Sequence, residues 1–189
     1  TMAAKTYLFG VAMLVSNGDQ ITIMQPAPFL QIGIGKFLGI PIPIYIMFTL
    51  VIISHVLLKK TVFGRRAIAV GANEVSAKLS GVNPDRTRII VYTISSVTAT
   101  IAGIVMASLT QQAYAMNATG YELDVITAIV VGGTSLMGGS GSVIGALIGA
   151  VMVGFINNGL NLLDMPSAYH PIATGIVILV ALIMNQGVS

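Results

Sequence analysis

The sequence has 189 residues, of which 55% are hydrophobic and 8% are charged, and its formal net charge is +3. A soluble domain usually carries about a quarter of charged residues, so this composition excludes an ordinary water-soluble fold and predicts a membrane protein. The absence of cysteine excludes disulfides, zinc–thiolate sites, iron–sulfur clusters and cysteine nucleophiles, and a charge of +3 is not a nucleic-acid signature.

Apolar segments follow one another along the chain and predict an all-α, polytopic membrane protein with about six membrane segments. Four are long enough to cross about 30 Å of hydrocarbon as helices: 42–58, 88–110, 142–163 and 171–184. Two are shorter: 2–16, which we interpret as a truncated helix, and 125–137, which we expect to be short or re-entrant. We expect 1–189 to form a single transmembrane domain whose natural chain extends further at the N-terminus.

The basic residues predict an orientation in the membrane. Seven of the nine fall between the second and third segments: Lys59, Lys60, Arg65, Arg66, Lys78, Arg86 and Arg88. Because Lys and Arg concentrate in cytoplasmic loops, the connection 59–87, here called the elbow, is predicted to be cytoplasmic. Alternation through six segments then places 17–41 and 111–124 outside and the C-terminus inside.

The elbow contains helix signals of its own. Asn73 is a favourable N-cap, Glu74 places a carboxylate in the first turn, and Gly81 suits the left-handed residue that ends a helix. These signals predict one short helix over 74–80, and Asn83 followed by Pro84 predicts the start of the next helix. Basic loops often serve only to fix topology, but a capped helix on a basic elbow also suits docking to another protein.

A glycine-rich stretch, GGTSLMGGSGSVIGALIGA, covers 132–150. Its Gly141, Gly145 and Gly149 recur every four residues, and they predict one helix face that a second helix can approach closely. A phosphate loop is rejected because the stretch has no GxxxxGK[ST] and no lysine follows Lys78.

Polar residues interrupt the apolar segment that follows. Asn157, Asn158 and Asn161 are expected to avoid lipid, either through hydrogen bonds between helices or by lining a polar path. Together with Thr134 and Ser135 they are our candidates for a pathway. An uncharged substrate would fit the shortage of ionisable residues in the apolar segments.

Several of these motifs carry a resemblance to a known family. FGRRAIAVG at 63–71 and NEVSAKLSGV at 73–82 resemble the coupling loop of permeases from ribose-type sugar importers, which are ATP-binding-cassette transporters. GGTSLMGGSGS, IGALIG and FINNGLNLL resemble the C-terminal pattern of the same permeases, and GIPIPI at 39–44 fits their entry into a membrane helix. The match extends over most of the chain. Ser76 stands where the coupling motif commonly has a second Ala.

The resemblance implies a fold related to that of cobalamin importers, in the bacterial inner membrane. It implies a separate ATPase subunit, a periplasmic sugar-binding protein and a second permease subunit, with membrane lipid around them. It also implies coupling to the ATPase through the short elbow helix, at Asn73, Glu74, Ala77, Lys78 and Gly81. The chain would cover roughly the latter half of such a permease.

No catalytic residues, metal site or cofactor are predicted. His55 and His170 have no plausible set of ligands nearby, and Glu122 and Asp124 fall in an outer loop without a nucleophile. Two alternatives to a sugar permease stay open: a permease for branched-chain amino acids or nucleosides, and a self-contained channel or secondary carrier. An amino-acid permease should offer a cation or a helix N-terminus to the carboxylate of its substrate. A channel or secondary carrier should show a buried charged relay or repeated broken helices.

Overall fold

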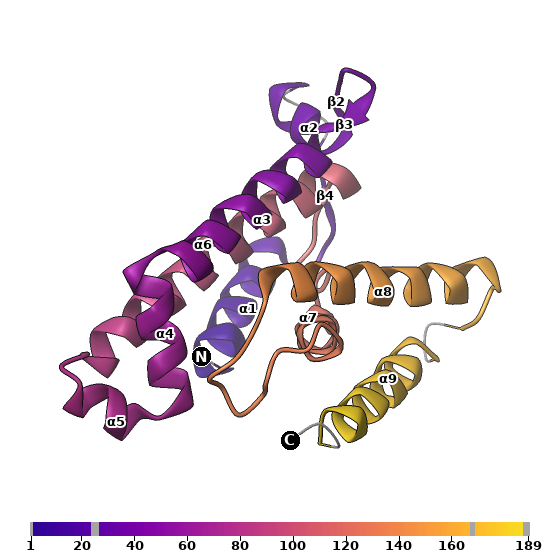
Figure 1. Cartoon of the computed structure of the whole chain (residues 1–189). Helices are drawn as coiled ribbons and strands as arrows, with labels where there is room; N and C mark the ends of the chain where they lie inside the picture. Colours follow the sequence, from indigo (N-terminus) through magenta and orange to yellow (C-terminus); the bar gives the residue numbers. More distant parts are fainter. Residues whose placement is uncertain (1, 24–26, 167–168, 187–189) are drawn as a thin grey trace. The chain divides into compact units, whose positions relative to one another are not determined.

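The computed structural model describes residues 2–23, 27–166 and 169–186, and it is mostly helical (Figure 1). The helices are α1 Met2–Ser16, α2 Ala27–Ile34, α3 Ile42–Lys60, α4 Val62–Ala72, α5 Glu74–Leu79, α6 Pro84–Thr110, α7 Tyr121–Val131, α8 Val143–Leu162 and α9 Tyr169–Gln186. Four strands of two residues accompany them: β1 Ile21–Thr22, β2 Lys36–Phe37, β3 Ile40–Pro41 and β4 Gln112–Ala113. The predicted helical class holds, with these short strands as an addition.

Three helices among the described residues are long and apolar enough to cross a membrane: α3, α6 and α8. They confirm the predicted spans at 42–58, 88–110 and 142–163 as helices of the required length. The fourth span, 171–184, falls in α9, whose apolar part is described over Tyr169–Leu179, and as a span it stays a prediction.

The helix predicted at 125–137 is shorter and begins earlier. α7 runs from Tyr121 to Val131, because Gly120 precedes it with a left-handed φ of 94° and Gly132 and Gly133 follow it, the second with a φ of +80°. Its 11 residues cover about 16 Å at 1.5 Å per residue. The expectation of a short segment is therefore right, and its predicted boundaries are wrong.

The described chain divides into two compact units, and the first consists of 1–50 and 94–119. In it β1 pairs with β4 in antiparallel register, and β2 pairs with β3 in a hairpin whose tip has positive φ at Leu38 and Gly39. The helix α2 is fixed to α6 by the fully buried Ser108. The Ser108 hydroxyl accepts a hydrogen bond from Gly33 N at 2.8 Å and donates one to the Phe29 carbonyl at 2.7 Å.

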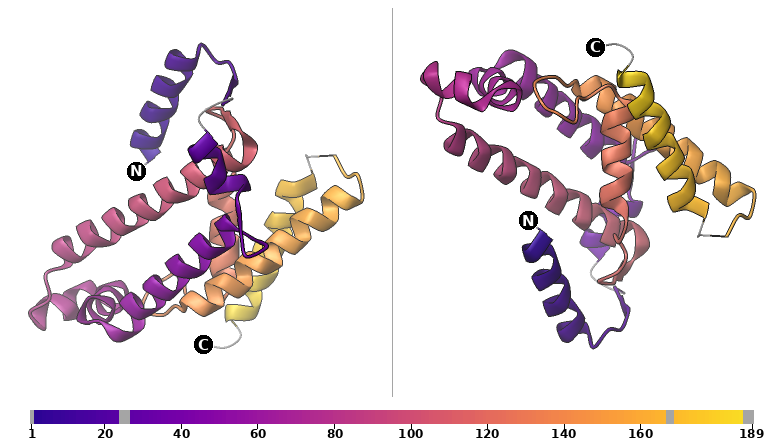
Figure 2. Two further views of the ribbon diagram at one scale, coloured as in Figure 1. Left: turned by 90° about the horizontal axis from the view of Figure 1, so that it is seen from above. Right: turned by 90° about the horizontal axis from the view of Figure 1, so that it is seen from below.

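The second unit consists of 51–93 and 120–189 and carries all the candidate site residues. Within it α7 packs against both α8 and α9, which are seen beside it in Figure 2. The packed face of α7 supplies the buried residues Thr127, Ala128 and Val130. Thr174 of α9 donates to the Asp124 carboxylate of α7 at 3.3 Å, so Asp124 has a structural partner.

Candidate functional site

The elbow begins at a tight corner between α3 and α4. The Thr61 hydroxyl donates to the Leu57 carbonyl at 2.5 Å and accepts from Gly64 N at 3.2 Å, so it ends one helix and caps the next. Gly64 is buried, and a Cβ there would overlap the carbonyl oxygens of Leu57 and Leu58. The helix α4 was not predicted from the sequence. Thr61 followed by an apolar residue is the capping signal that could have revealed it.

The short helix α5 is built as predicted, and it ends at Leu79, one residue before the predicted boundary. Asn73 closes α4 with its N–H on the Ala69 carbonyl at 3.0 Å, and its side-chain oxygen accepts from Ser76 N at 2.9 Å. Gly81 ends the helix in the left-handed conformation, with a φ of +80°. One asparagine therefore joins α4 and α5 without a linker.

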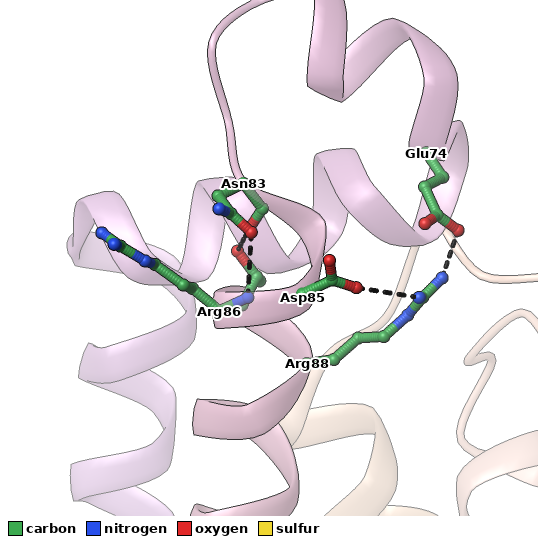
Figure 3. A network of polar contacts seen from close by, with 6 residues as sticks. Glu74, Asn83, Asp85, Arg86 and Arg88 are labelled. Atoms are coloured by element: carbon green, nitrogen blue, oxygen red, sulfur yellow. Dashed lines mark hydrogen bonds and ion pairs between the residues drawn. The ribbon is translucent and has the colours of Figure 1, made fainter.

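A polar network ties the start of α5 to the start of α6 (Figure 3). The Arg88 guanidinium contacts the Glu74 carboxylate and lies 3.8 Å from the Asp85 carboxylate. Asn83 caps α6 through its side-chain oxygen, which accepts from Arg86 N at 3.1 Å, and this confirms the predicted start at Pro84. Because Glu74 and Arg88 are about half exposed, the pair contributes at most about 1 kcal/mol to stability and acts mainly on orientation.

The outward surface of α5 differs from the predicted coupling set. Ala77 is buried, with 5% of its surface exposed, whereas Lys78 is exposed. Val75 and Leu79 are 69% and 85% exposed, and a spacing of four places them on one face of the helix. The sequence analysis did not single out these two, although exposed apolar residues on a short helix are a signal for an interface.

The turn between α7 and α8 meets the last turn of α4. Gly138 and Gly139 both have left-handed φ, and their backbones lie against Gly71 and Ala72. A Cβ at Gly139 would lie 2.9 Å from the Ala72 Cβ, and one at Gly138 would overlap the Gly71 carbonyl. Apart from the Ala72 methyl, the contact is therefore one of backbone on backbone, and the positive φ and close approach at Gly138 and Gly139 favour glycine there.

The glycines of α8 pack against α7. A Cβ at Gly149 would overlap the Ala128 carbonyl, and one at Gly145 would overlap the Gly132 carbonyl. Gly141 differs, because it precedes α8 and a Cβ there would lie 3.1 Å from the Thr134 methyl. The predicted three-glycine helix face is thus wrong at Gly141, since Ser142 caps α8 and starts the helix only at Val143.

The candidate pathway residues are not gathered in one place. Thr134 and Ser135 line a cavity of about 360 Å³ beside the glycine turn, before α8 begins. Asn157 lies 14 residues into α8, about 21 Å along its axis. Its side-chain oxygen is buried without a partner among the described residues, whereas Asn158 and Asn161 are exposed.

A metal centre finds no support in the described part of the chain, where no three His, Cys, Asp or Glu side chains gather. Lys59, Lys60, Arg65, Arg66 and Arg86 are exposed on the elbow. The elbow thus has a basic surface and an apolar tip, formed by Val75 and Leu79, and its last α4 turn lies against the glycine turn Gly138–Gly139.

Comparison with known proteins gives consistent matches along the chain. The ribose import permease protein RbsC of Haemophilus influenzae is 43% identical over 189 residues, and that of Bacillus subtilis is 40% identical over 187. The L-arabinose transport system permease protein AraH of Escherichia coli is 36% identical over 186 residues. Each alignment covers 98% of this chain but only 56–58% of the relative, and no solved structure matches. Residues 1–182 match the family described as branched-chain amino acid transport system / permease component, and the chain therefore belongs to that family.

Proposed function

We propose that this chain forms the larger part of the permease subunit of an ATP-binding-cassette importer that carries a monosaccharide of the ribose type across the bacterial inner membrane. The observation that carries the proposal is the elbow, a short helix capped at both ends that presents Val75 and Leu79 outward. An ATPase subunit docks on this tip from the cytoplasm, and ATP hydrolysis belongs to that partner. A second permease subunit and a periplasmic sugar-binding protein complete the transporter.

The membrane arrangement belongs to the proposal as well. Six membrane segments, of which α1 and α7 are the short ones, place the elbow and the C-terminus in the cytoplasm, in a fold related to that of cobalamin importers. The helices α3, α6 and α8 support this arrangement, because each is long enough to cross a membrane and exposes apolar side chains that suit lipid. The basic residues of the elbow support the orientation.

A sugar is favoured over an amino acid as substrate. The relatives named above are ribose and arabinose permeases, whereas the family description mentions branched-chain amino acids. A carboxylate substrate calls for a cation or a helix N-terminus at the site. The helix α8, which carries Asn157, has no charged residue in its length, and amides suit the hydroxyl groups of a neutral sugar.

The test compares two leucines of equal exposure in the whole permease that contains this sequence. Leu79 is 85% exposed at the elbow tip and Leu38 is 84% exposed in the hairpin of the other unit. We expect Leu79→Asp to weaken retention of the ATPase subunit during purification about 30-fold, as for a hot-spot residue worth about 2 kcal/mol. Leu38→Asp should leave retention unchanged.

Uptake into proteoliposomes, with the ATPase and the binding protein present, tests the substrate. Ribose uptake should depend on ATP, and excess leucine should not compete with it. Equal retention of the ATPase by Leu79→Asp and Leu38→Asp would contradict the proposal that the ATPase docks on α5. Competition by leucine would move the amino-acid alternative ahead.

A further inference from the structure

We propose that the glycine turn Gly138–Gly139 receives the motion of the elbow and passes it to the α7–α8 pair. The turn and the last turn of α4 move as one body during transport. This inference rests on the proposed function, because it needs an ATPase that displaces the elbow. It assigns Gly71, Ala72, Gly138 and Gly139 as positioning residues.

The contact contains no side chain that could change rotamer. A Cβ at Gly71 would lie 3.2 Å from Gly139 N, and a Cβ at Gly139 would lie 3.0 Å from the Ala72 Cα. Longer side chains at such a contact would absorb a small displacement by changing rotamer. Glycine and alanine have no rotamers, so a shift of one backbone displaces the other.

On the elbow side, the contact lies one residue away from α5, the helix on which the ATPase is proposed to dock. Ala72 ends α4, and the next residue, Asn73, caps α5. Asn73 is held at both ends, by the Ala69 carbonyl at 3.0 Å and by Ser76 N at 2.9 Å. A displacement of α5 therefore reaches Ala72 with no flexible segment between them.

The receiving side is braced in turn. Ser135 N donates to the Ser140 carbonyl at 3.2 Å, and Gly138 N donates to the Ser135 carbonyl at 3.2 Å. The turn connects α7 to α8, and these helices already touch through Gly132 and Gly145. Motion of the turn is thus carried into the helix on which Asn157 lies.

The contact is also localised. Ala67 and Ile68, earlier in α4, line a cavity of about 360 Å³ together with Val143 and Ala146 at the start of α8. In the described part of α4, the glycine turn approaches closely at Gly71 and Ala72. A competing route runs through Arg88 and Glu74 into α6, but those side chains are about half exposed and hydrated, and they form a more compliant link.

This sequence contains no cysteine, so a cross-linking experiment in the whole permease requires replacement only of cysteines that lie outside it. Ala72→Cys with Gly139→Cys should form a disulfide on oxidation, because about 1 Å of opening brings the two Cβ atoms from 2.9 Å to the separation of roughly 3.8 Å that a disulfide needs. If the two turns move together, ATP-driven sugar uptake should stay within about twofold of the reduced protein, well below the usual scale of coupling effects. Failure to cross-link would overturn the contact. Loss of uptake that dithiothreitol restores would show that the contact opens during transport. It would overturn the proposal that the two turns move as one body.

A wedge variant tests transmission itself. Gly71→Val should lower uptake per ATP hydrolysed at least about fivefold, the low end of usual coupling effects, while the ATPase stays bound. Ala69→Val adds the same side chain at an exposed position of α4 and should change nothing. Normal uptake by Gly71→Val with bound ATPase would overturn the route alone. A wild type that binds no ATPase would overturn the proposed function, and the route with it.

Discussion

The substitution Gly149→Ala probes the packing of α8 on α7. The added Cβ would overlap the Ala128 carbonyl oxygen and would lie 2.9 Å from Gly132 N, so the helices must separate locally. Overpacking of this kind costs about 1–3 kcal/mol. Gly154 lies five residues further along α8, where a Cβ meets nothing within 4 Å, and Gly154→Ala is the matched control.

At the control site only the helix propensity changes, which favours Ala over Gly by about 1 kcal/mol. Because this gain is common to both variants, they should differ by the overpacking cost of roughly 1–3 kcal/mol in free energy of unfolding, with Gly149→Ala the less stable. Titration with SDS in detergent micelles, followed by ellipticity, measures this difference. Equal stabilities, or a more stable Gly149→Ala, would refute the close approach of the two helices at this glycine.

Two further predictions concern the contact between α2 and α6 and the end of α5. Ser108→Val removes the buried hydrogen bonds of the Ser108 hydroxyl with Gly33 N and the Phe29 carbonyl and should cost about 1–3 kcal/mol in the same titration, whereas Ser95→Val, at an exposed position of α6, should cost less than about 0.5 kcal/mol. Gly81→Val forces a β-branched residue into a φ of +80° and should speed tryptic cleavage of the elbow, and cleavage at the wild-type rate would contradict the left-handed cap.

Local signals predicted the local structure of the elbow. Asn73, Gly81 and Asn83 were recognised because a cap acts on atoms two or three residues away, and the structure has all three in those roles. The helix α4 was missed because its two glycines and paired arginines obscure the capping signal at Thr61. The helix α2 was missed in a predicted loop, although Pro28 in its first turn is a start signal.

Long-range contacts could not be predicted in this way. The Ser108 hydroxyl contacts the Gly33 amide across 75 residues of sequence, and Gly138 contacts Gly71 across 67. Nothing in the sequence distinguishes a glycine that makes such a contact from a glycine that only forms a turn. The glycine spacing at 141, 145 and 149 did predict close packing, but a period of four cannot show where a helix begins. Ser142 decides that point, and it removes Gly141 from the helix.

The buried side chain of Asn157 bears on the two interpretations of the polar residues in α8, which are hydrogen bonds between helices and the lining of a polar path. Its side-chain oxygen is buried, and no other described group in the chain donates to it. An unpaired amide oxygen costs several kcal/mol in hydrocarbon, so a donor must come from elsewhere. That donor is either a group outside the described residues or water in a polar path. Either partner would keep the Asn157 face of α8 away from lipid.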